Sequence, residues 1–394
     1  MAVIRALFQQ IALATSMLCG RGAALRASNR VALQCYTLHH VIYFQTLVRA
    51  LANRSDIEFE LLFLPHPHIA SSEKLAIARF ARESLGLQTR SVVTLGSRYW
   101  TRFDVILYPD TFARLMPRSR ANVLLYHGIG TPRRYTRRAI YRRSAAAFDL
   151  VLSASELDTL LLEAQRPARA KMRVVTTGTV LFDRIPVREP RRLDYLRGLG
   201  FVPTDAPTVL VAPHWSRLLH ADKGLIEQWR QALAKLAELD AHVILKLHAH
   251  SYHPIANRGR DWRSTTTNWV NARVRLDPTI DDAVALSHAD VLVTDVSSRA
   301  LVAASLGTPV VRFDDSTLSG HVSRPYPLEQ AWSETLEEAS FVATNLPELL
   351  ACVRTALTGG SPPSAKSALA RAGIVNDKAV TSRIVDTLAS LMVR

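Results

Sequence analysis

The chain has 394 residues, 48% of them apolar, so it is long enough to bury two cores of ordinary size and is not expected to be disordered over most of its length. Its three cysteines, Cys19, Cys35 and Cys352, are too few and too scattered for a disulfide framework, and no pair has metal-ligand spacing, which fits a reducing cytoplasm. A formal net charge of +15 favours an anionic partner: nucleic acid, an anionic membrane surface or a phosphorylated substrate.

Residues 1–29 contain an apolar run, Ile11–Leu18, that follows a single basic residue, Arg5. The run is far shorter than the roughly 20 residues that a membrane-spanning helix needs, so no transmembrane segment is expected. The basic region before it is weak for a secretory signal, and Leu18-Cys19-Gly20 is only faintly similar to a lipoprotein site. We expect residues 1–29 to be an amphipathic segment that lies on a membrane or packs on the body of the protein.

Strand and helix patterns alternate through residues 30–185, which predicts a parallel, doubly wound sheet. Strands are expected at short β-favouring apolar runs, and helices where apolar residues recur every three or four positions. The predicted strands are Arg30–Tyr36, Phe59–Leu64, Ser91–Leu95, Val105–Tyr108, Val123–Tyr126 and Leu150–Ser153, and the predicted helices are His40–Leu51 and Ser72–Leu85.

A second α/β series, residues 186–345, begins in a join rich in proline and charge, Ile185–Arg197. Its predicted strands are Thr208–Ala212, His242–Leu247, Val274–Leu276, Val291–Val293 and Val310–Phe313, and its clearest helices are Lys223–Glu238 and Ser298–Leu306. Residues 346–394 are predicted to be helices, interrupted at residues 359–363, that can pack back on the first domain.

The region from Thr111 to Phe148 holds nine arginines and no acidic residue. Six of them recur at spacings that gather them on one side of a helix: Arg133, Arg134, Arg137, Arg138, Arg142 and Arg143. This basic face predicts contact with an anionic substrate or an anionic membrane surface. The alternative is an ordinary solvated helix face, although such faces usually mix both signs of charge.

His127 follows the predicted strand Val123–Tyr126 and precedes Gly128 and Gly130, which leave backbone room beside its imidazole. In open α/β sheets, ligands bind at the carboxyl ends of strands. A lone histidine is more often structural, and this position raises the functional interpretation to equal weight.

Two further strand ends carry polar or aromatic groups. Lys246 and His248 end the strand that contains Val243–Leu245, where both can meet phosphate oxygens. His214 ends another strand beside Trp215, whose ring can support a base or a sugar. The histidines after residue 247 match a zinc site only weakly, because no carboxylate lies near them in the sequence.

Residues 289–315 read as a strand, a loop, a helix and a second strand. Ser297 or Ser298 can cap the helix, and Arg299 lies in its first turn. A helix N-terminus offers unpaired N–H groups and a partial positive charge, so this segment suits a phosphate or diphosphate, although an ordinary capped helix is an equal alternative. No dinucleotide or P-loop motif is present elsewhere, and Asp281-Asp282 does not have metal-ligand spacing.

Four stretches of the chain occur in the same order in a known family, the CDP-glycerol glycerophosphotransferases of the teichoic-acid polymerase type, which the chain resembles. The HGTPLK stretch of that family is similar to HGIGTPRR at residues 127–134, and its APTWR to APHWSR at residues 212–217. Its KLHP is similar to KLHA at residues 246–249. Its fourth motif, an aspartate followed by two hydrophobic residues and TDYSS, is similar to DVLVTDVSS at residues 290–298. Four motifs in order are far more specific than any one alone.

The resemblance implies an α/β GT-B fold, in which an acceptor domain (residues 30–185) and a nucleotide-donor domain (residues 186–345), both Rossmann-like, face a cleft. It implies transfer of a glycerol-phosphate-like unit from a CDP-activated polyol donor to a hydroxyl of a glycan or lipid-linked acceptor, in cell-envelope polymer synthesis at the inner face of the membrane. No cofactor, metal or nucleic acid is expected.

The resemblance also implies roles for residues. His127 would be the base and His248 a second catalytic residue. The donor phosphate and nucleotide would be bound by Lys246, Ser297, Ser298, Arg299, Asp295, His214 and Arg217. Val296, Ala249 and His214 replace the family's tyrosine, proline and threonine, and Arg133 or Arg134 its lysine, which leaves the donor head group open.

Two other functions remain open at this point. A sugar-nucleotide glycosyltransferase or epimerase of the GT-B type would share the fold and the phosphate-binding helix, and would explain the departures from the family motifs. A non-catalytic anion-binding protein would use the arginine face but would leave the ordered strand-end motifs without a purpose.

Overall fold

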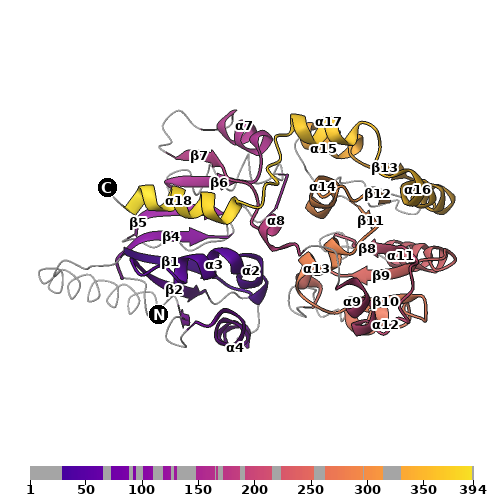
Figure 1. Cartoon of the computed structure of the whole chain (residues 1–394), viewed down its shortest axis with the longest axis horizontal. Coiled ribbons are helices and arrows are strands. Elements are labelled where there is room, and N and C mark those ends of the chain that lie inside the picture. Colours follow the sequence, from indigo (N-terminus) through magenta and orange to yellow (C-terminus); the bar gives the residue numbers. More distant parts are fainter. Residues whose placement is uncertain are drawn as a thin grey trace, which may run out of the picture.

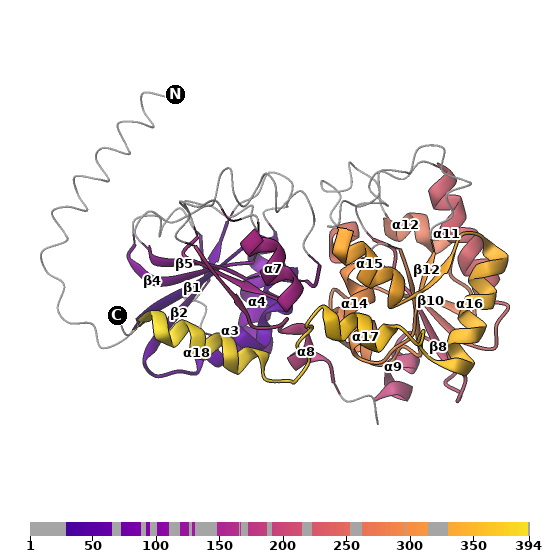
Figure 2. The ribbon, with the colours of Figure 1, turned by 90° about the horizontal axis from the view of Figure 1, so that it is seen from above.

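The structure, a computed structural model, describes residues 29–64, 72–87, 92–94, 101–109, 119–125, 128–130, 148–164, 166, 172–186, 191–214, 223–252, 262–295, 297–313 and 330–392. In this part of the chain, two sheets of parallel strands lie side by side, each covered by helices (Figure 1, Figure 2).

The first sheet belongs to the N-terminal domain. Its strands are β1 (Asn29–Cys35), β2 (Ile57–Phe63), β3 (Val92–Thr94), β4 (Phe103–Tyr108), β5 (Ser119–Leu125), β6 (Leu150–Ser153) and β7 (Arg173–Thr176). They lie in the order β3-β2-β1-β4-β5-β6-β7, and Val31 of β1 pairs with Phe59 of β2 and Val105 of β4. The order reverses between β1 and β4, and ligands bind beside the carboxyl ends of strands at such a reversal.

The second sheet repeats this winding in the C-terminal domain. Its strands are β8 (Thr208–Val211), β9 (His242–Lys246), β10 (Val274–Asp277), β11 (Val291–Thr294), β12 (Val310–Phe313) and β13 (Phe341–Ala343). Their order is β10-β9-β8-β11-β12-β13, and Val209 of β8 pairs with Val243 of β9 and Val291 of β11. The reversal lies between β8 and β11.

Helices connect the strands and cover the sheets. Those of the N-terminal domain are α2 (Leu38–Tyr43), α3 (Gln45–Ala52), α4 (Glu73–Leu85), α7 (Glu156–Ala164) and α8 (Leu181–Arg184). Those that follow are α9 (Arg192–Gly198), α11 (Lys223–Leu236), the 3-10 helix η3 (Ala249–Tyr252), α12 (Trp262–Thr267), α13 (Asp282–Ser287), α14 (Ser298–Ser305), α15 (Gln330–Glu338), α16 (Leu346–Gly359), α17 (Ala365–Arg371) and α18 (Val380–Met392).

The last helix, α18, packs on the N-terminal domain. It contacts α3, β4 and α8, and Figure 1 shows it lying across the first sheet. Arg383 Nε donates to the carbonyl of Thr177 at 2.9 Å, and the Asp183 carboxylate accepts the N–H groups of Val380 and Thr381 at 3.2 and 2.5 Å. The chain therefore crosses between the two domains twice.

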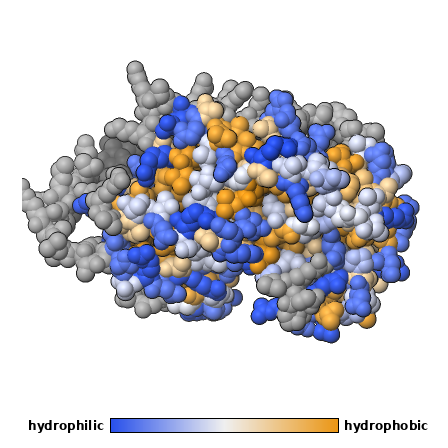
Figure 3. Space-filling view, turned by 45° about the horizontal axis from the view of Figure 1, so that its top comes forward, coloured by the Kyte–Doolittle hydropathy of each residue, from blue (hydrophilic) through white to orange (hydrophobic). Residues whose placement is uncertain are grey.

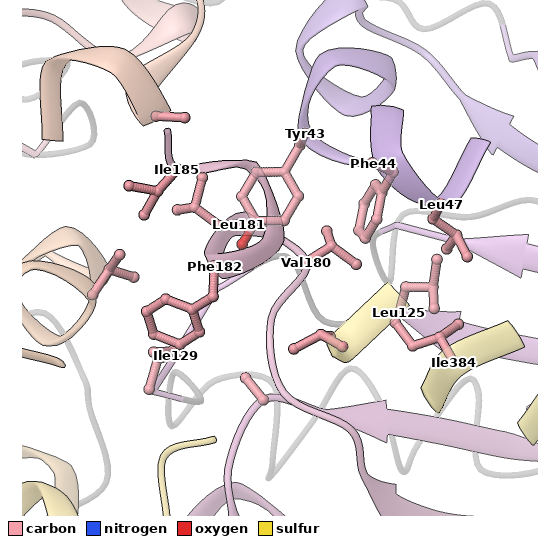
Figure 4. Packing of buried hydrophobic residues seen from close by; sticks show 14 of the residues in the cluster. Tyr43, Phe44, Leu47, Leu125, Ile129, Val180, Leu181, Phe182, Ile185 and Ile384 are labelled. Carbon is pink, nitrogen blue, oxygen red and sulfur yellow. The ribbon is translucent and has the colours of Figure 1, made fainter. Parts of the chain in front are cut away.

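Apolar packing also continues from one domain into the other. One group of buried side chains includes Val31 of β1 together with Leu292 of β11 and Leu301 of α14. Figure 4 shows part of this group, where Leu181 of α8 lies beside Tyr43 of α2. On the face shown in Figure 3, the domains meet in a continuous surface that mixes hydrophobic and hydrophilic residues. The structure thus holds the domains in contact.

The structure confirms the predicted pair of parallel, doubly wound α/β domains. It contains two strands that were not predicted, β7 and β13, which are short and lie at sheet edges, so neither has a long apolar run. The prediction of one helix over His40–Leu51 was wrong. Phe44 interrupts it between α2 and α3 with φ −97° and ψ 16°, and its side chain is buried, at 1% exposed.

Candidate active site

The N-terminus of α14 in the second domain lies against residues 128–130 of the first. Ser297 caps this helix, since its hydroxyl accepts the N–H of Arg299 at 3.3 Å. A Cβ atom placed on Gly128 would lie 3.3 Å from Ser298 Oγ, so a larger residue here would require the Ser298 side chain to shift by a few tenths of an ångström. Two of the four motifs, distant in sequence and on different domains, are therefore adjacent in space.

A buried carboxylate fixes this contact. The backbone N–H of Gly130 donates to Asp158 Oδ2 at 3.4 Å, and Trp332 Nε1 of α15 donates to Asp158 Oδ1 at 2.9 Å. Asp158 and Trp332 are both 0% exposed and come from different domains. Gly130 has φ +89°, a conformation that favours glycine. The loop after β5 is thus held by the second domain as well as by its own.

Hydrogen bonds at the reversal of the second sheet join the motif at residues 212–217 to the motif at residues 290–298. The N–H of His214, after β8, donates to Asp295 Oδ1 at 2.9 Å. Thr294 Oγ1, at the end of β11, donates to the carbonyl of Ala212 at 2.7 Å. Asp295 is 1% exposed and therefore orders the backbone around His214.

Lys246 ends β9 with its ammonium group engaged by protein partners. The side chain is 1% exposed, lies 3.4 Å from a carboxylate oxygen of Asp277, and donates to Thr279 Oγ1 at 2.8 Å and to the Thr279 carbonyl. Burial lowers the pKa of Lys246, and the carboxylates of Asp282 and Asp277 oppose that shift. The proposed contact of Lys246 with phosphate stays a prediction.

Arg299 forms a bidentate ion pair with Asp282 at the start of α13. Its Nε and Nη2 donate to the two carboxylate oxygens at 2.8 and 2.9 Å. Burial raises the pKa of Asp282, but Arg299, Lys246 and His39 together lower it below its ordinary value. Arg299 therefore neutralises a buried carboxylate, and its contact with a donor phosphate also stays a prediction.

His248 meets a residue of the other domain. Its ring centroid lies 5.2 Å from that of His39 in α2, just after β1. Beside this contact is a small interdomain cavity whose lining includes His39, Asp282 and Arg184. Arg184 pairs with Asp281 at 2.5 Å across the domain boundary and donates to the carbonyl of Tyr43 at 3.2 Å. The carboxyl ends of both sheets therefore meet in one polar region.

Several predicted site residues lie outside the described residues. They are His127, Arg217 and the arginines of the predicted basic face, Arg133, Arg134, Arg137, Arg138, Arg142 and Arg143. Gly128, directly after His127, and His214, three residues before Arg217, are described and lie at the strand ends given above.

Four residues of this region were not predicted: His39, Arg184, Asp281 and Asp282. His39 follows a predicted strand closely, so the rule applied to His127 and His248 would have found it. Asp281 caps α13, because its carboxylate accepts the N–H of Ala283 at 2.9 Å. Aspartate is a preferred helix cap, so the two adjacent aspartates in the sequence could have indicated this helix start. Nothing in the sequence around Arg184 indicated its pairing.

Among the residues that the structure describes, no group of three His, Cys, Asp or Glu side chains could hold a metal ion. Within the same ranges, no helix is long and apolar enough to cross a membrane.

No protein-family profile and no curated protein sequence matches the chain, whereas solved structures do. A putative UDP-N-acetylglucosamine 2-epimerase from Listeria monocytogenes is similar with a TM-score of 0.62 and 14% identity, over 93% of this chain and 96% of that chain. A UDP-GlcNAc 2-epimerase from Neisseria meningitidis, bound to UDP-GlcNAc, has a TM-score of 0.60 and 15% identity, over 92% and 100% of the two chains.

The Wall Teichoic Acid Polymerase TagF is also similar to the chain. A variant soaked with CDPG has a TM-score of 0.60 and 13% identity, over 93% of this chain and 90% of that chain. Identities this low show a common fold. The chain therefore has the two-domain GT-B fold of these proteins, which confirms the predicted architecture.

Proposed function

We propose that the chain is an enzyme that binds a CDP-activated polyol donor between its domains and transfers a glycerol-phosphate-like unit to a hydroxyl of a glycan or lipid-linked acceptor. The observation that carries this proposal is the contact of Gly128 with Ser298. His127, the proposed base, directly precedes Gly128 in the sequence, and Ser298 begins the helix proposed to bind phosphate.

The proposed donor site is the N-terminus of α14. The N–H groups of its first turn and the hydroxyl of Ser298 would receive the diphosphate, because a helix start combines unpaired donors with partial positive charge. Asp295 and the backbone of His214 lie beside this helix, where a nucleotide base or sugar would extend along the ends of β8 and β11.

In the proposed chemistry, His127 removes the proton of the acceptor hydroxyl as its oxygen attacks phosphorus. The bond from phosphorus to the bridging oxygen breaks, and CMP leaves with the negative charge. Donors at α14 and His248 would stabilise that charge, and loss of one such donor typically costs about 10²–10³ in rate. Acceptor delivery fits a protein that associates with the inner face of the membrane through its arginine face.

A second function is comparably supported: a GT-B glycosyltransferase or epimerase that acts on a UDP-linked sugar. The similarity to UDP-GlcNAc 2-epimerases, at TM-scores of 0.62 and 0.60, favours this alternative. It would use the same phosphate-binding helix but place a sugar carbon at the reacting position.

The test is to incubate the purified protein with CDP-glycerol or with a panel of UDP-sugars, each with and without a hydroxyl acceptor. Release of CMP that depends on an acceptor supports the transferase. Release of UDP, or epimerisation of the sugar, supports the alternative and contradicts the CDP-donor proposal. Anion binding without turnover of any donor would indicate a non-catalytic protein.

A further inference from the structure

Two histidines from different domains pack against each other, and one of them, His39, lines the small interdomain cavity. His39 lies in α2, after the first strand of the N-terminal sheet, and His248 follows β9 of the C-terminal sheet. Their ring centroids are 5.2 Å apart, with an angle of 55° between the planes. His39 is buried, at 9% exposed, whereas His248 is half-buried. His39 is therefore the inner member of the pair.

A carboxylate stands beside the inner histidine. Asp282 lines the same interdomain cavity as His39, and the charge of His39 contributes to lowering the pKa of Asp282. Arg299 fixes the Asp282 carboxylate through both of its oxygens. A carboxylate that is ionised and held in place stabilises the protonated form of a neighbouring imidazole.

We propose that His39 is a positioning residue for His248, and that Asp282 in turn holds His39. Its use in catalysis rests on the proposed function, since His248 is there assigned to the leaving phosphate. The three side chains cross the domain boundary twice, from Asp282 in the second domain to His39 in the first and back to His248. The orientation and proton affinity of His248 therefore depend on contact between the domains.

Several titratable and charged groups surround the imidazole pair. They are His40, Tyr43, Arg184, Asp281 and Asp282, together with Glu73, whose carboxylate accepts the N–H of Leu38 at 2.7 Å, and Arg299 and Lys246, whose charges act on Asp282. Arg184 and Asp281 neutralise each other at 2.5 Å. Burial raises the pKa of Tyr43 to about 12, so its hydroxyl stays neutral in the physiological range.

This environment predicts coupled titration of the two imidazoles. When two like groups are in contact, a proton on one disfavours a proton on the other. Asp282 favours the proton on His39, so His248 would be the ring that is harder to protonate. Removal of His39 should make His248 easier to protonate.

The test is an NMR titration of histidine-labelled protein, with the His248 signal assigned from its loss in His248→Gln. In His39→Gln and His39→Phe, we expect the titration midpoint of His248 to rise by about half a unit or more. The phenylalanine variant keeps a ring in the buried slot and guards against a folding defect in the glutamine variant. His242→Gln is the control, because His242 starts the strand β9 at the end opposite His248 and should leave the midpoint unchanged.

Enzyme assays then separate the two proposals. With an active donor, His39→Gln should lower kcat about tenfold, leave KM within about twofold, and move the pH profile by the same amount as the NMR midpoint. A shifted midpoint in a protein that turns over no donor would support the positioning role and contradict the proposed function. An unchanged midpoint in folded variants of both kinds would overturn the positioning role, whatever the activity.

Discussion

Gly128 and Ser298 lie next to each other across the boundary between the two domains, so that a side chain at position 128 would require Ser298 to shift. A Cβ there would lie 3.3 Å from Ser298 Oγ and 3.5 Å from its Cβ. The loop that follows β5 and the helix that follows β11 thus form one surface, although 170 residues separate them in the sequence. Gly128 directly follows the proposed base, His127, in the sequence, and Ser298 begins the helix proposed to bind phosphate.

Gly128→Val should disrupt this contact. The added methyl groups must displace Ser298 or separate the domains, so we expect at least a tenfold loss of turnover and about 1–3 kcal/mol lower unfolding free energy. Gly359→Val is the matched control, because no atom lies within 4 Å of a Cβ at that position. Equal activity of the two variants in a steady-state assay would mean that the domain contact is irrelevant to function.

Lys246→Met should destabilise the protein, because it leaves the fully buried Asp277 carboxylate without its cation. Loss of one partner of a buried pair costs about 3–5 kcal/mol, and Asp277→Asn in the same chain should recover part of it. The pKa of Lys246 is lowered in the folded protein, so the unfolded chain binds more protons below the ordinary value of 10.5, and wild-type stability gains with rising pH. The wild-type advantage over Lys246→Met should therefore be larger at an alkaline pH just below 10.5 than at neutral pH.

Urea denaturation with far-UV circular dichroism measures both effects. The control is Lys235→Met, which removes an exposed pair with Glu238 and should cost less than about 1 kcal/mol at either pH. A Lys246→Met variant as stable as this control would show that the buried pair does not contribute to folding.

His127→Ala should abolish turnover while leaving thermal unfolding close to wild type, because the imidazole is assigned to proton removal and not to the core. Loss of a general base costs about 10²–10⁴ in rate. A rate within about threefold of wild type, measured on whichever donor proves active, would exclude the base assignment.

The arginine face should bind vesicles that contain anionic lipid, with affinity that falls steeply between about 0.05 and about 0.15 M salt. Each basic residue near such a surface contributes about 1 kcal/mol. Arg133 and Arg134 are the arginines closest to His127 in the sequence, so changing them could affect the active site itself. The decisive variant therefore changes only Arg137, Arg138, Arg142 and Arg143 to glutamine. Undiminished vesicle binding by this variant in a sedimentation assay would rule out membrane contact, and lost activity on a short soluble acceptor would instead indicate a substrate groove.

The strand and helix pattern of the sequence was enough to predict the two doubly wound sheets, because buried parallel strands are short apolar runs that local composition reveals. The expectation that Lys246 and His248 come at a strand end agrees with β9, and the expectation that Ser297 or Ser298 caps the later helix agrees with the Ser297 cap of α14, while their roles stay predictions. The sequence did not reveal that Lys246 pairs with Asp277, or that Arg299 pairs with Asp282, because such partners are chosen by the packing of strands and helices that lie far apart in the sequence.

Contacts between the domains could not be predicted from the sequence. The pairing of His39 with His248, and of Arg184 with Asp281, depends on how the two domains are oriented. No periodicity within either domain encodes that orientation. The interruption of the helix at Phe44 was also not predicted, because the apolar spacing of residues 40–51 continues through that position without a break.

Calorimetric titration with CDP and with UDP tests the central claim, that a nucleoside diphosphate binds at the start of α14. We expect one site per chain in the wild-type protein, and about 10- to 100-fold weaker binding in Ser298→Ala, since a hydrogen bond to a charged group contributes about 1.5–3 kcal/mol. Ser305→Ala, at the opposite end of the same helix, should bind as wild type does. Absence of binding to the wild-type protein, or equal affinity in all three proteins, would contradict the account.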